Sequence, residues 1–324
     1  MRLPAAGRAR PQLRKAMRGK TESRIAGNRK HSDPRSPKPS WGRIRPLANL
    51  LALLVAGPSG AAEFHPDIEY GRVGDQPLRL DAGLPAGEGP FPVAILIHGG
   101  GWSSGDRRGD ITILTNALNA ARFTWFSVDY RLAPAHRWPA CHEDVLAAIR
   151  WVKTHAHRFK GDTNRIALVG YSAGGHLAVH AAVLADDATR VQAVAALAAP
   201  VDHLADSERR GGLSQSLQGL LDRPPELDAA TRATLRELSP RNFIRPGLPP
   251  FLLVHGTADT SVPYPQSTNL LARLRAARVP AELVTLTNAP HRIAQWASFD
   301  ALWAERLVAS LARALHSKLA PRHD

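Results

Sequence analysis

Short apolar runs alternate along the chain with longer segments in which apolar residues recur every three or four positions. The runs predict strands, and the recurrences predict amphipathic helices. The predicted strands are residues 68–73, 78–80, 93–97, 123–130, 165–169, 191–198, 251–254 and 281–286, and the predicted helices are residues 110–121, 141–158, a stretch from Ala173, 265–278 and 297–316.

This alternation is typical of the α/β fold class, in which a mostly parallel central sheet has helices on both faces. Residues 201–246 interrupt it, because they are polar and predicted to be irregular apart from a short helix near 228–237. We expect this insertion to form a small lid over the carboxyl edge of the sheet, where the active sites of open α/β sheets lie.

The first 62 residues differ in composition from the rest. Residues 1–40 are rich in Arg, Lys, Pro, Ser and Gly and are predicted to be a disordered basic leader. Residues 41–62 resemble a signal peptide, with a basic start, an apolar run too short to span a bilayer, and small residues up to Ala62. We interpret the leader as a translation start assigned too early; a tail that binds nucleic acid or lipid is the alternative. We expect a periplasmic or secreted protein.

The charge of the chain is concentrated in this leader. The formal net charge is +14. Residues 1–62 hold 14 basic residues (Lys and Arg) and 2 acidic residues (Asp and Glu), whereas the rest of the chain holds 28 basic and 26 acidic residues. The folded domain is therefore nearly neutral, and we expect no nucleic-acid partner. We also expect no stable membrane insertion, because the apolar run within residues 41–62 is too short to span a bilayer. With 324 residues, 44% of them hydrophobic, the chain can form one large core. The sequence does not determine an oligomeric state.

A glycine-containing pentapeptide lies between a predicted strand and a predicted helix: Gly170-Tyr171-Ser172-Ala173-Gly174. A strand, a sharp turn and a helix with a serine at the apex form a nucleophile elbow, whose pattern is Gly-x-Ser-x-Gly. Glycines suit this turn because larger side chains would collide with neighbouring backbone. A run of one histidine and three glycines follows the strand at 93–97 and supports the interpretation. We therefore expect Ser172 to be a nucleophile.

Such a serine needs a base within hydrogen-bonding reach, and the base needs an acid that orients it. In this arrangement the chain order is serine, acid, histidine. Asp259 and His291 each follow a predicted strand, which places them at the same sheet edge as Ser172. We predict Asp259 as the acid and His291 as the base. Asp202, which also follows a predicted strand, is the alternative acid.

Backbone amides must stabilise the oxyanion that forms when a serine attacks an ester. The amide of Ala173 lies at the start of a helix, where the helix dipole assists. Gly100 and Gly101 are the other predicted donors, because glycine lets the backbone approach a ligand closely. Trp102 follows these glycines, and we expect Trp102 and Tyr171 to line the substrate pocket.

Other reactive side chains have simpler interpretations. His98 precedes the serine in the chain and is expected to brace the glycine run. His176 and His180 have the spacing of zinc ligands on a helix, but Leu177 stands where a zinc protease has its Glu, so we expect packing. Cys141, the single cysteine, is expected to be buried. We predict no metal and no cofactor.

Four motifs in this order resemble the α/β-hydrolase esterases of the hormone-sensitive-lipase-like group, and most of all small bacterial acetyl esterases and feruloyl or acetylxylan esterases. The motifs are His98-Gly99-Gly100-Gly101-Trp102, Asp129-Tyr130-Arg131-Leu132-Ala133-Pro134, Gly170-Tyr171-Ser172-Ala173-Gly174-Gly175-His176 and His255-Gly256-Thr257-Ala258-Asp259. The resemblance implies a catalytic domain over residues 63–324 with the α/β-hydrolase fold and a triad of Ser172, Asp259 and His291. One departure is Asn288-Ala289-Pro290-His291, where the group has Gly-x-x-His.

The expected activity is hydrolysis of short-chain acyl esters, acetyl or feruloyl esters of carbohydrates among them, through an acyl-enzyme. A formamidase or a peptidase of the same fold is one alternative, although such peptidases add a large propeller domain for which about 260 residues leave no room. A ligand-binding protein on an inactive hydrolase fold is the other alternative. The partner in every case is a small-molecule or carbohydrate ligand.

Overall fold

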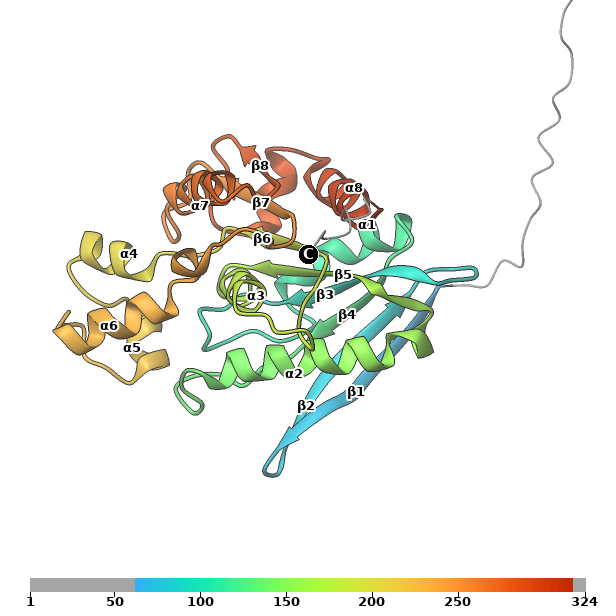
Figure 1. The fold of residues 1–324 in the computed structure, drawn as a ribbon, viewed down its shortest axis with the longest axis horizontal. Coiled ribbons are helices and arrows are strands. Elements are labelled where there is room, and N and C mark those ends of the chain that lie inside the picture. Colours follow the sequence, from blue (N-terminus) through green and yellow to red (C-terminus); the bar gives the residue numbers. More distant parts are fainter. Residues whose placement is uncertain (1–61, 317–324) are drawn as a thin grey trace, which may run out of the picture. The chain divides into compact units, whose positions relative to one another are not determined.

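The computed structural model describes residues 62–316, which fold around one eight-stranded sheet (Figure 1). The predicted leader at 1–40 and all but the last residue of the predicted signal peptide at 41–62 lie outside the described residues. The strands are β1 (Glu63–Val73), β2 (Gln76–Leu84), β3 (Phe91–Ile97), β4 (Thr124–Val128), β5 (Gly161–Tyr171), β6 (Ala193–Leu197), β7 (Phe251–Gly256) and β8 (Ala281–Leu286).

The order of strands in the sheet is β1-β2-β4-β3-β5-β6-β7-β8. The strands β4, β3, β5, β6, β7 and β8 are parallel, and β1 and β2 form an antiparallel hairpin at one edge. The parallel strands therefore end at a common edge. The expected α/β class with a mostly parallel sheet is confirmed, and the two predicted edge strands are longer than their apolar residues indicate.

Helices cover both faces of the sheet. They are α1 (Thr115–Ala120), α2 (Ala140–His155), α3 (Ala173–Val183), α4 (His203–Arg210), α5 (Gln215–Leu221), α6 (Ala229–Leu238), α7 (Pro265–Ala276) and α8 (Trp303–His316). Four short 3₁₀ segments accompany them: η1 (Asp110–Leu114), η2 (Ala156–Phe159), η3 (Pro240–Phe243) and η4 (Ile293–Ser298).

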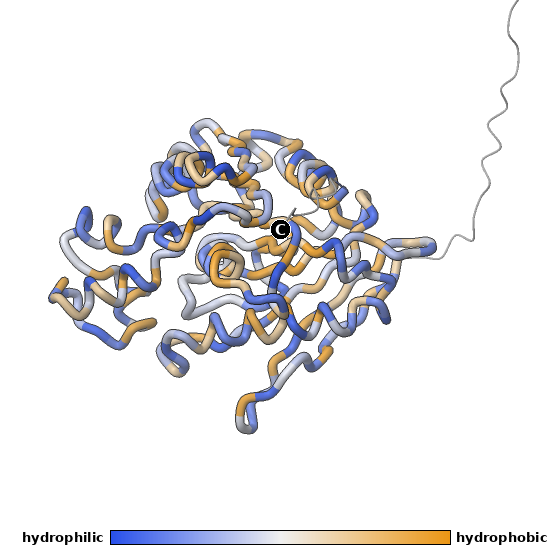
Figure 2. Tube along the Cα trace, in the orientation of Figure 1, coloured by the Kyte–Doolittle hydropathy of each residue, from blue (hydrophilic) through white to orange (hydrophobic). Residues whose placement is uncertain are grey.

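The two cores on either face of the sheet follow from the alternation of side chains along each strand. In β3, Val93, Ile95 and Ile97 pack with α2 and α3, whereas Ala94 and Leu96 pack on the opposite side with α1 and α8. A strand that is apolar at every position can only be buried on both faces. Figure 2 shows hydrophobic residues concentrated along the central strands.

Two predicted α-helices begin later in the structure than in the prediction. The segment predicted at 110–121 is divided into η1 and α1, because the hydroxyls of Thr112 and Thr115 donate to backbone carbonyls three residues earlier and compete with helical hydrogen bonds. The helix predicted from residue 297 begins at Trp303, after η4. The carboxylate of Asp300 accepts a hydrogen bond from the amide of Leu302 in the turn between η4 and α8.

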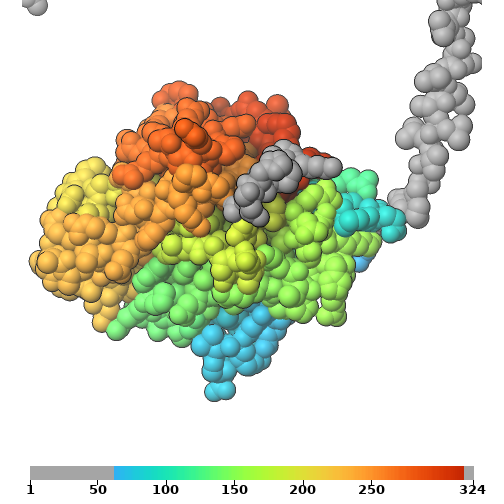
Figure 3. Space-filling model, viewed as in Figure 1, coloured from blue at the N-terminus to red at the C-terminus, as the bar shows by residue number. Residues whose placement is uncertain are grey.

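The insertion at 201–246 is more regular than the sequence predicts, because it contains α4, α5 and α6 in place of one short helix. Each helix begins with a side-chain cap, from Asp202, Ser214 and Asp228 respectively. Helices of seven to ten residues complete too few turns to show a clear period in the sequence. In Figures 1 and 3 the lid forms a lobe at one side of the sheet.

Candidate active site

Ser172 occupies a strained turn between β5 and α3. Its φ of 53° and ψ of −118° lie outside the regions that side chains prefer, at a cost of about 1–3 kcal/mol. The turn requires glycine on both sides of the serine. A Cβ on Gly170 would lie 2.1 Å from the carbonyl oxygen of Gly174, and a Cβ on Gly174 would lie 2.2 Å from that of Ile97. The serine hydroxyl is thereby held at the carboxyl edge of the sheet.

The structure brings the predicted nucleophile, base and acid together. Ser172 Oγ lies 2.9 Å from His291 Nε2, and His291 Nδ1 lies 2.6 Å from Asp259 Oδ2. Ser172, Asp259 and His291 follow β5, β7 and β8, whose carboxyl ends meet at one edge of the parallel sheet. With Asp259 accepting from Nδ1, Nε2 of the neutral imidazole faces the serine hydroxyl as an acceptor.

Asp259 is held as a carboxylate. Burial raises its pKa, but hydrogen bonds from His255 and His291 outweigh this and hold the pKa below its usual value. The amides of Ser261 and Val262 donate to the second oxygen, Oδ1, at 2.9 and 2.8 Å. A charged acceptor that is itself fixed by two amides keeps the imidazole in one orientation.

Asp202 does not lie beside His291. Its side chain accepts the amide of Ala205 as the cap of α4 and forms an ion pair with Arg241. The alternative acid therefore stabilises the start of the lid helix.

The three predicted oxyanion donors border the same cavity as Ser172. Gly100 and Gly101 have φ values of 100° and 59°, so the chain turns sharply after β3 and exposes their amides. Within residues 62–316 the amides of Gly100, Gly101 and Ala173 have no hydrogen-bond acceptor. Free amides beside a serine hydroxyl are what an oxyanion requires.

Tyr171 and Trp102 both line the cavity and are both buried. The hydroxyl of Tyr171 donates to the carbonyl of His291 at 2.7 Å, which fixes the loop that carries this histidine. Burial raises the pKa of Tyr171, so the hydroxyl remains a donor. The indole N–H of Trp102 donates to His176 Nδ1 at 3.2 Å. Both aromatic residues therefore border the cavity and also position backbone around it.

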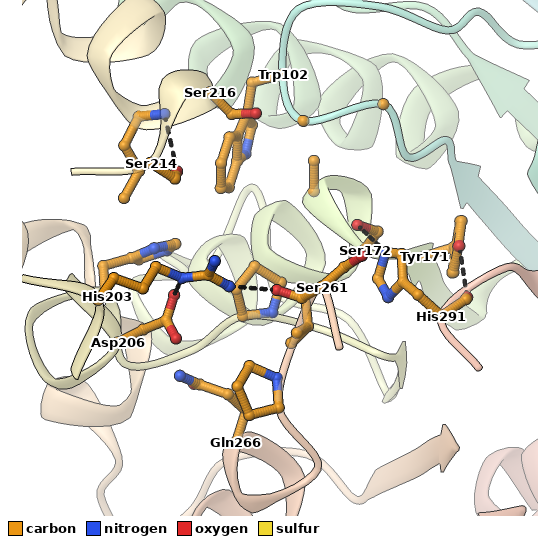
Figure 4. Close-up of a pocket in the computed structure, with 18 of the residues that line it drawn as sticks. Trp102, Tyr171, Ser172, His203, Asp206, Ser214, Ser216, Ser261, Gln266 and His291 are labelled. Carbon is orange, nitrogen blue, oxygen red and sulfur yellow. Dashed lines mark hydrogen bonds and ion pairs between the residues drawn. The ribbon is translucent and has the colours of Figure 1, made fainter. Parts of the chain in front are cut away.

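The cavity has a volume of about 470 Å³ and extends from Ser172 and His291 to the lid (Figure 4). Its far wall is polar. The guanidinium of Arg210 donates to Asp206 Oδ2 at 2.7 Å and to the carbonyl of Ser261 at 2.6 Å. Other polar residues in the lining are Asp110, His203, Ser214, Ser216 and Gln266. The sequence gives no indication of Asp206 and Arg210, because both lie on a helix that its pattern does not predict.

Three other histidines, His98, His176 and His180, are buried near the site, and their contacts are structural. His98 Nδ1 lies 2.8 Å from the carbonyl of Gly99, and its ring stacks on Tyr130, which agrees with a bracing role. His176 and His180 contact lid carbonyls through Nε2. Among the described residues, no group of three or more His, Cys, Asp or Glu side chains is arranged to hold a metal ion.

A family model named BD-FAE matches residues 80–274, more than half of the chain. The chain belongs to the BD-FAE family. This BD-FAE protein is 34% identical over 204 residues to the esterase LipC of Mycobacterium tuberculosis, a match that covers 58% of the chain and 49% of LipC. It is 32% identical over 264 residues to the carboxylesterase NlhH of the same organism, covering 77% of the chain and 82% of NlhH. The chain thus spans about half the length of LipC and most of NlhH.

The solved structure of a butyrate-bound esterase from Thermogutta terrifontis superposes on the chain with a TM-score of 0.63 and 25% identity. The match covers 81% of this BD-FAE protein and 96% of that chain. Together with the sheet order, these similarities confirm the α/β-hydrolase fold.

Proposed function

We propose that the protein is a serine carboxylesterase that hydrolyses short-chain acyl esters through an acyl-enzyme. The observation that carries the proposal is the chain of hydrogen bonds from Ser172 through His291 to Asp259, which faces a cavity bordered by free amides. The carboxylesterase and esterase names of the relatives support it.

In this mechanism His291 Nε2 takes the proton of Ser172 as the serine oxygen attacks the ester carbonyl. The resulting oxyanion is stabilised by the amides of Gly100, Gly101 and Ala173. The imidazolium then gives the proton to the leaving alcohol, and the acyl group stays on the serine. A water molecule, activated by the same imidazole, cleaves the acyl-enzyme and releases the acid.

A small acyl group fits this site best. Trp102 is a bulky ring beside the oxyanion amides, and the lid contributes mostly polar side chains to the cavity. Each buried methylene of a fatty acyl chain contributes about 0.8 kcal/mol only where apolar surface receives it. That the related Thermogutta structure holds butyrate supports the same conclusion.

The polar lid wall favours a hydroxylated alcohol, such as a sugar, over an alkyl alcohol. Asp206 offers acceptors and Arg210 offers donors at the end of the cavity away from the serine. We expect Arg210→Gln to lower kcat/KM for an acetylated sugar about tenfold more than for nitrophenyl acetate, since a hydrogen bond to a charged group contributes about 1.5–3 kcal/mol. Equal losses on both substrates would mean that Arg210 only supports the loop at Ser261 and does not contact the alcohol.

The activity itself is tested with a fluorophosphonate probe and an ester panel. We expect covalent labelling at Ser172, and loss of ester hydrolysis by about a thousandfold or more in Ser172→Ala with the fold intact. Absence of labelling in the folded wild-type protein would favour a ligand-binding protein. Faster turnover of formyl-kynurenine than of acetylated and feruloylated sugars would favour the formamidase alternative.

We also propose that the protein is exported. The basic, apolar and small-residue segments at 41–62 support this, since they have the order of a signal peptide. Within residues 62–316, no helix has the length and apolar character needed to cross a membrane.

A further inference from the structure

Trp102 has a backbone conformation that a bulky residue rarely adopts. It is the third of three consecutive residues with positive φ, at 100°, 59° and 59° for Gly100, Gly101 and Trp102. The glycines adopt this region without strain, but the tryptophan needs contacts that hold it there. Its side chain is 4% exposed, and its carbonyl accepts the amide of Ala133 at 2.9 Å.

The side-chain contact that holds Trp102 is His176, and simple donor and acceptor rules determine the tautomer of that histidine. An indole N–H can only donate, so His176 Nδ1 must accept and carries no proton. The proton is therefore on Nε2, which lies 2.9 Å from the carbonyl of Leu238, a group that can only accept. Burial lowers the pKa of His176 well below its usual value, with the imidazoles of His203 and His180 adding to this, and the ring stays neutral.

The two hydrogen bonds, from Trp102 to His176 and from His176 to Leu238, form a relay that connects three parts of the molecule distant in the sequence. Trp102 ends the glycine turn after β3, His176 lies four residues after Ser172 on α3, and Leu238 is the last residue of the lid helix α6. The loop that carries the free amides is thus attached to the same helix as the nucleophile.

We infer that His176 is a positioning residue: by accepting from Trp102 it holds the amides of Gly100 and Gly101 in place beside Ser172, and by donating to Leu238 it holds the end of α6 against α3. The inference rests on the proposed esterase function and adds a residue to it. The bond to Trp102 supports turnover, and the bond to Leu238 supports the lid.

His180 offers a matched control. It lies one turn further along α3, is also buried, and donates from Nε2 to the carbonyl of Glu237 at 3.2 Å. Its ring contacts Trp138 and has no hydrogen bond to Trp102. A role in packing or in lid attachment alone would give the same result at His176 and His180.

The two bonds of His176 can be removed separately. The amide oxygen of Asn reaches the place of Nδ1, so His176→Asn keeps the acceptor for Trp102 and loses the donor to the carbonyl of Leu238. The amide nitrogen of Gln reaches the place of Nε2, so His176→Gln keeps the donor to Leu238 and loses the acceptor. The variants, with His180→Gln and Trp102→Phe, are compared by kcat and KM on nitrophenyl acetate.

We expect His176→Gln to lower kcat about tenfold or more with KM within about threefold, because small displacements of catalytic groups slow the chemical step. His176→Asn should retain most of kcat, and His180→Gln should match the wild type. Trp102→Phe should lower kcat similarly, and the double variant with His176→Gln should be no slower than either single variant. Equal losses in the Gln and Asn variants of His176 and in His180→Gln, or additive losses in the double variant, would overturn the inference.

A readout that does not use activity separates this inference from the proposed function. In a ¹⁵N spectrum the indole N–H of Trp102, assigned from Trp102→Phe, should shift and exchange faster with solvent in His176→Gln but not in His176→Asn. If the wild-type protein hydrolyses no ester and this pattern still appears, the proposed function fails and the relay stands. If esters are hydrolysed and the indole signal is the same in all His176 variants, the relay fails alone.

Discussion

Acidification should destabilise the junction between the lid and the sheet, because buried histidines gather there. His142 and His180 contact each other at 4.6 Å between ring centroids, and so do His176 and His203. They come from α2, α3 and α4, so the cluster joins the lid to the helices beneath it. Burial lowers the pKa of all four, and for His142 and His203 it lowers the pKa from 6.5 to about 3.

The sign of the effect follows from proton binding. Below pH 6.5 the unfolded chain binds protons at these histidines and the folded protein does not, so the free energy of unfolding falls as the pH falls. Between pH 7.5 and 5.5 each histidine with a folded pKa of about 3 removes about 1.4 kcal/mol. His142 and His203 together therefore remove about 3 kcal/mol. The carboxylate of Asp259, whose pKa is lowered, adds a loss only at a pH below about 4.

Urea unfolding followed by circular dichroism at pH 7.5, 6.5 and 5.5 measures this free energy. The double variant His142→Gln with His203→Gln should lose about 3 kcal/mol of this decrease, whereas His157→Gln, at an exposed position, should leave the decrease unchanged. A decrease of less than about 1 kcal/mol over this range, or an unchanged slope in the double variant, would refute the reasoning.

Three further predictions concern the site and the chain start. Asp259→Asn should lower kcat by about 10⁴-fold while Asp202→Asn leaves most of it, because only the first orients the base; similar losses in steady-state assays would contradict the assignment. A series of nitrophenyl esters should peak in kcat/KM between acetyl and butyryl, and Trp102→Ala should move the peak to longer chains; a wild-type peak at octanoyl would contradict a small pocket. N-terminal sequencing of exported protein should give a start near Ala62 or Glu63. An intact leader on a cytoplasmic product would contradict export.

The candidate site was largely predictable because its residues follow strands. A parallel sheet brings the carboxyl ends of its strands to one edge, so a serine, an aspartate and a histidine that each follow a strand must lie near one another. The spacing of Gly170 and Gly174 around Ser172 has the same local origin, since only glycine fits that turn. The fold class and the candidates Ser172, Asp259 and His291 thus follow from the sequence, and the structure was needed to exclude Asp202, which also follows a strand, as the acid.

The surroundings of these three residues depend on tertiary contacts that the sequence does not reveal. The lid helices are too short to show a period, so their positions depend on capping side chains and on burial against one another and beside α3. Arg210 and the acidic side chain beside it enter the cavity only when α4 is placed over it. The tautomer of His176 likewise depends on Trp102 and Leu238, which lie 74 residues before and 62 residues after it. Contacts between such distant residues leave no periodic pattern in a sequence, because no local geometry links them.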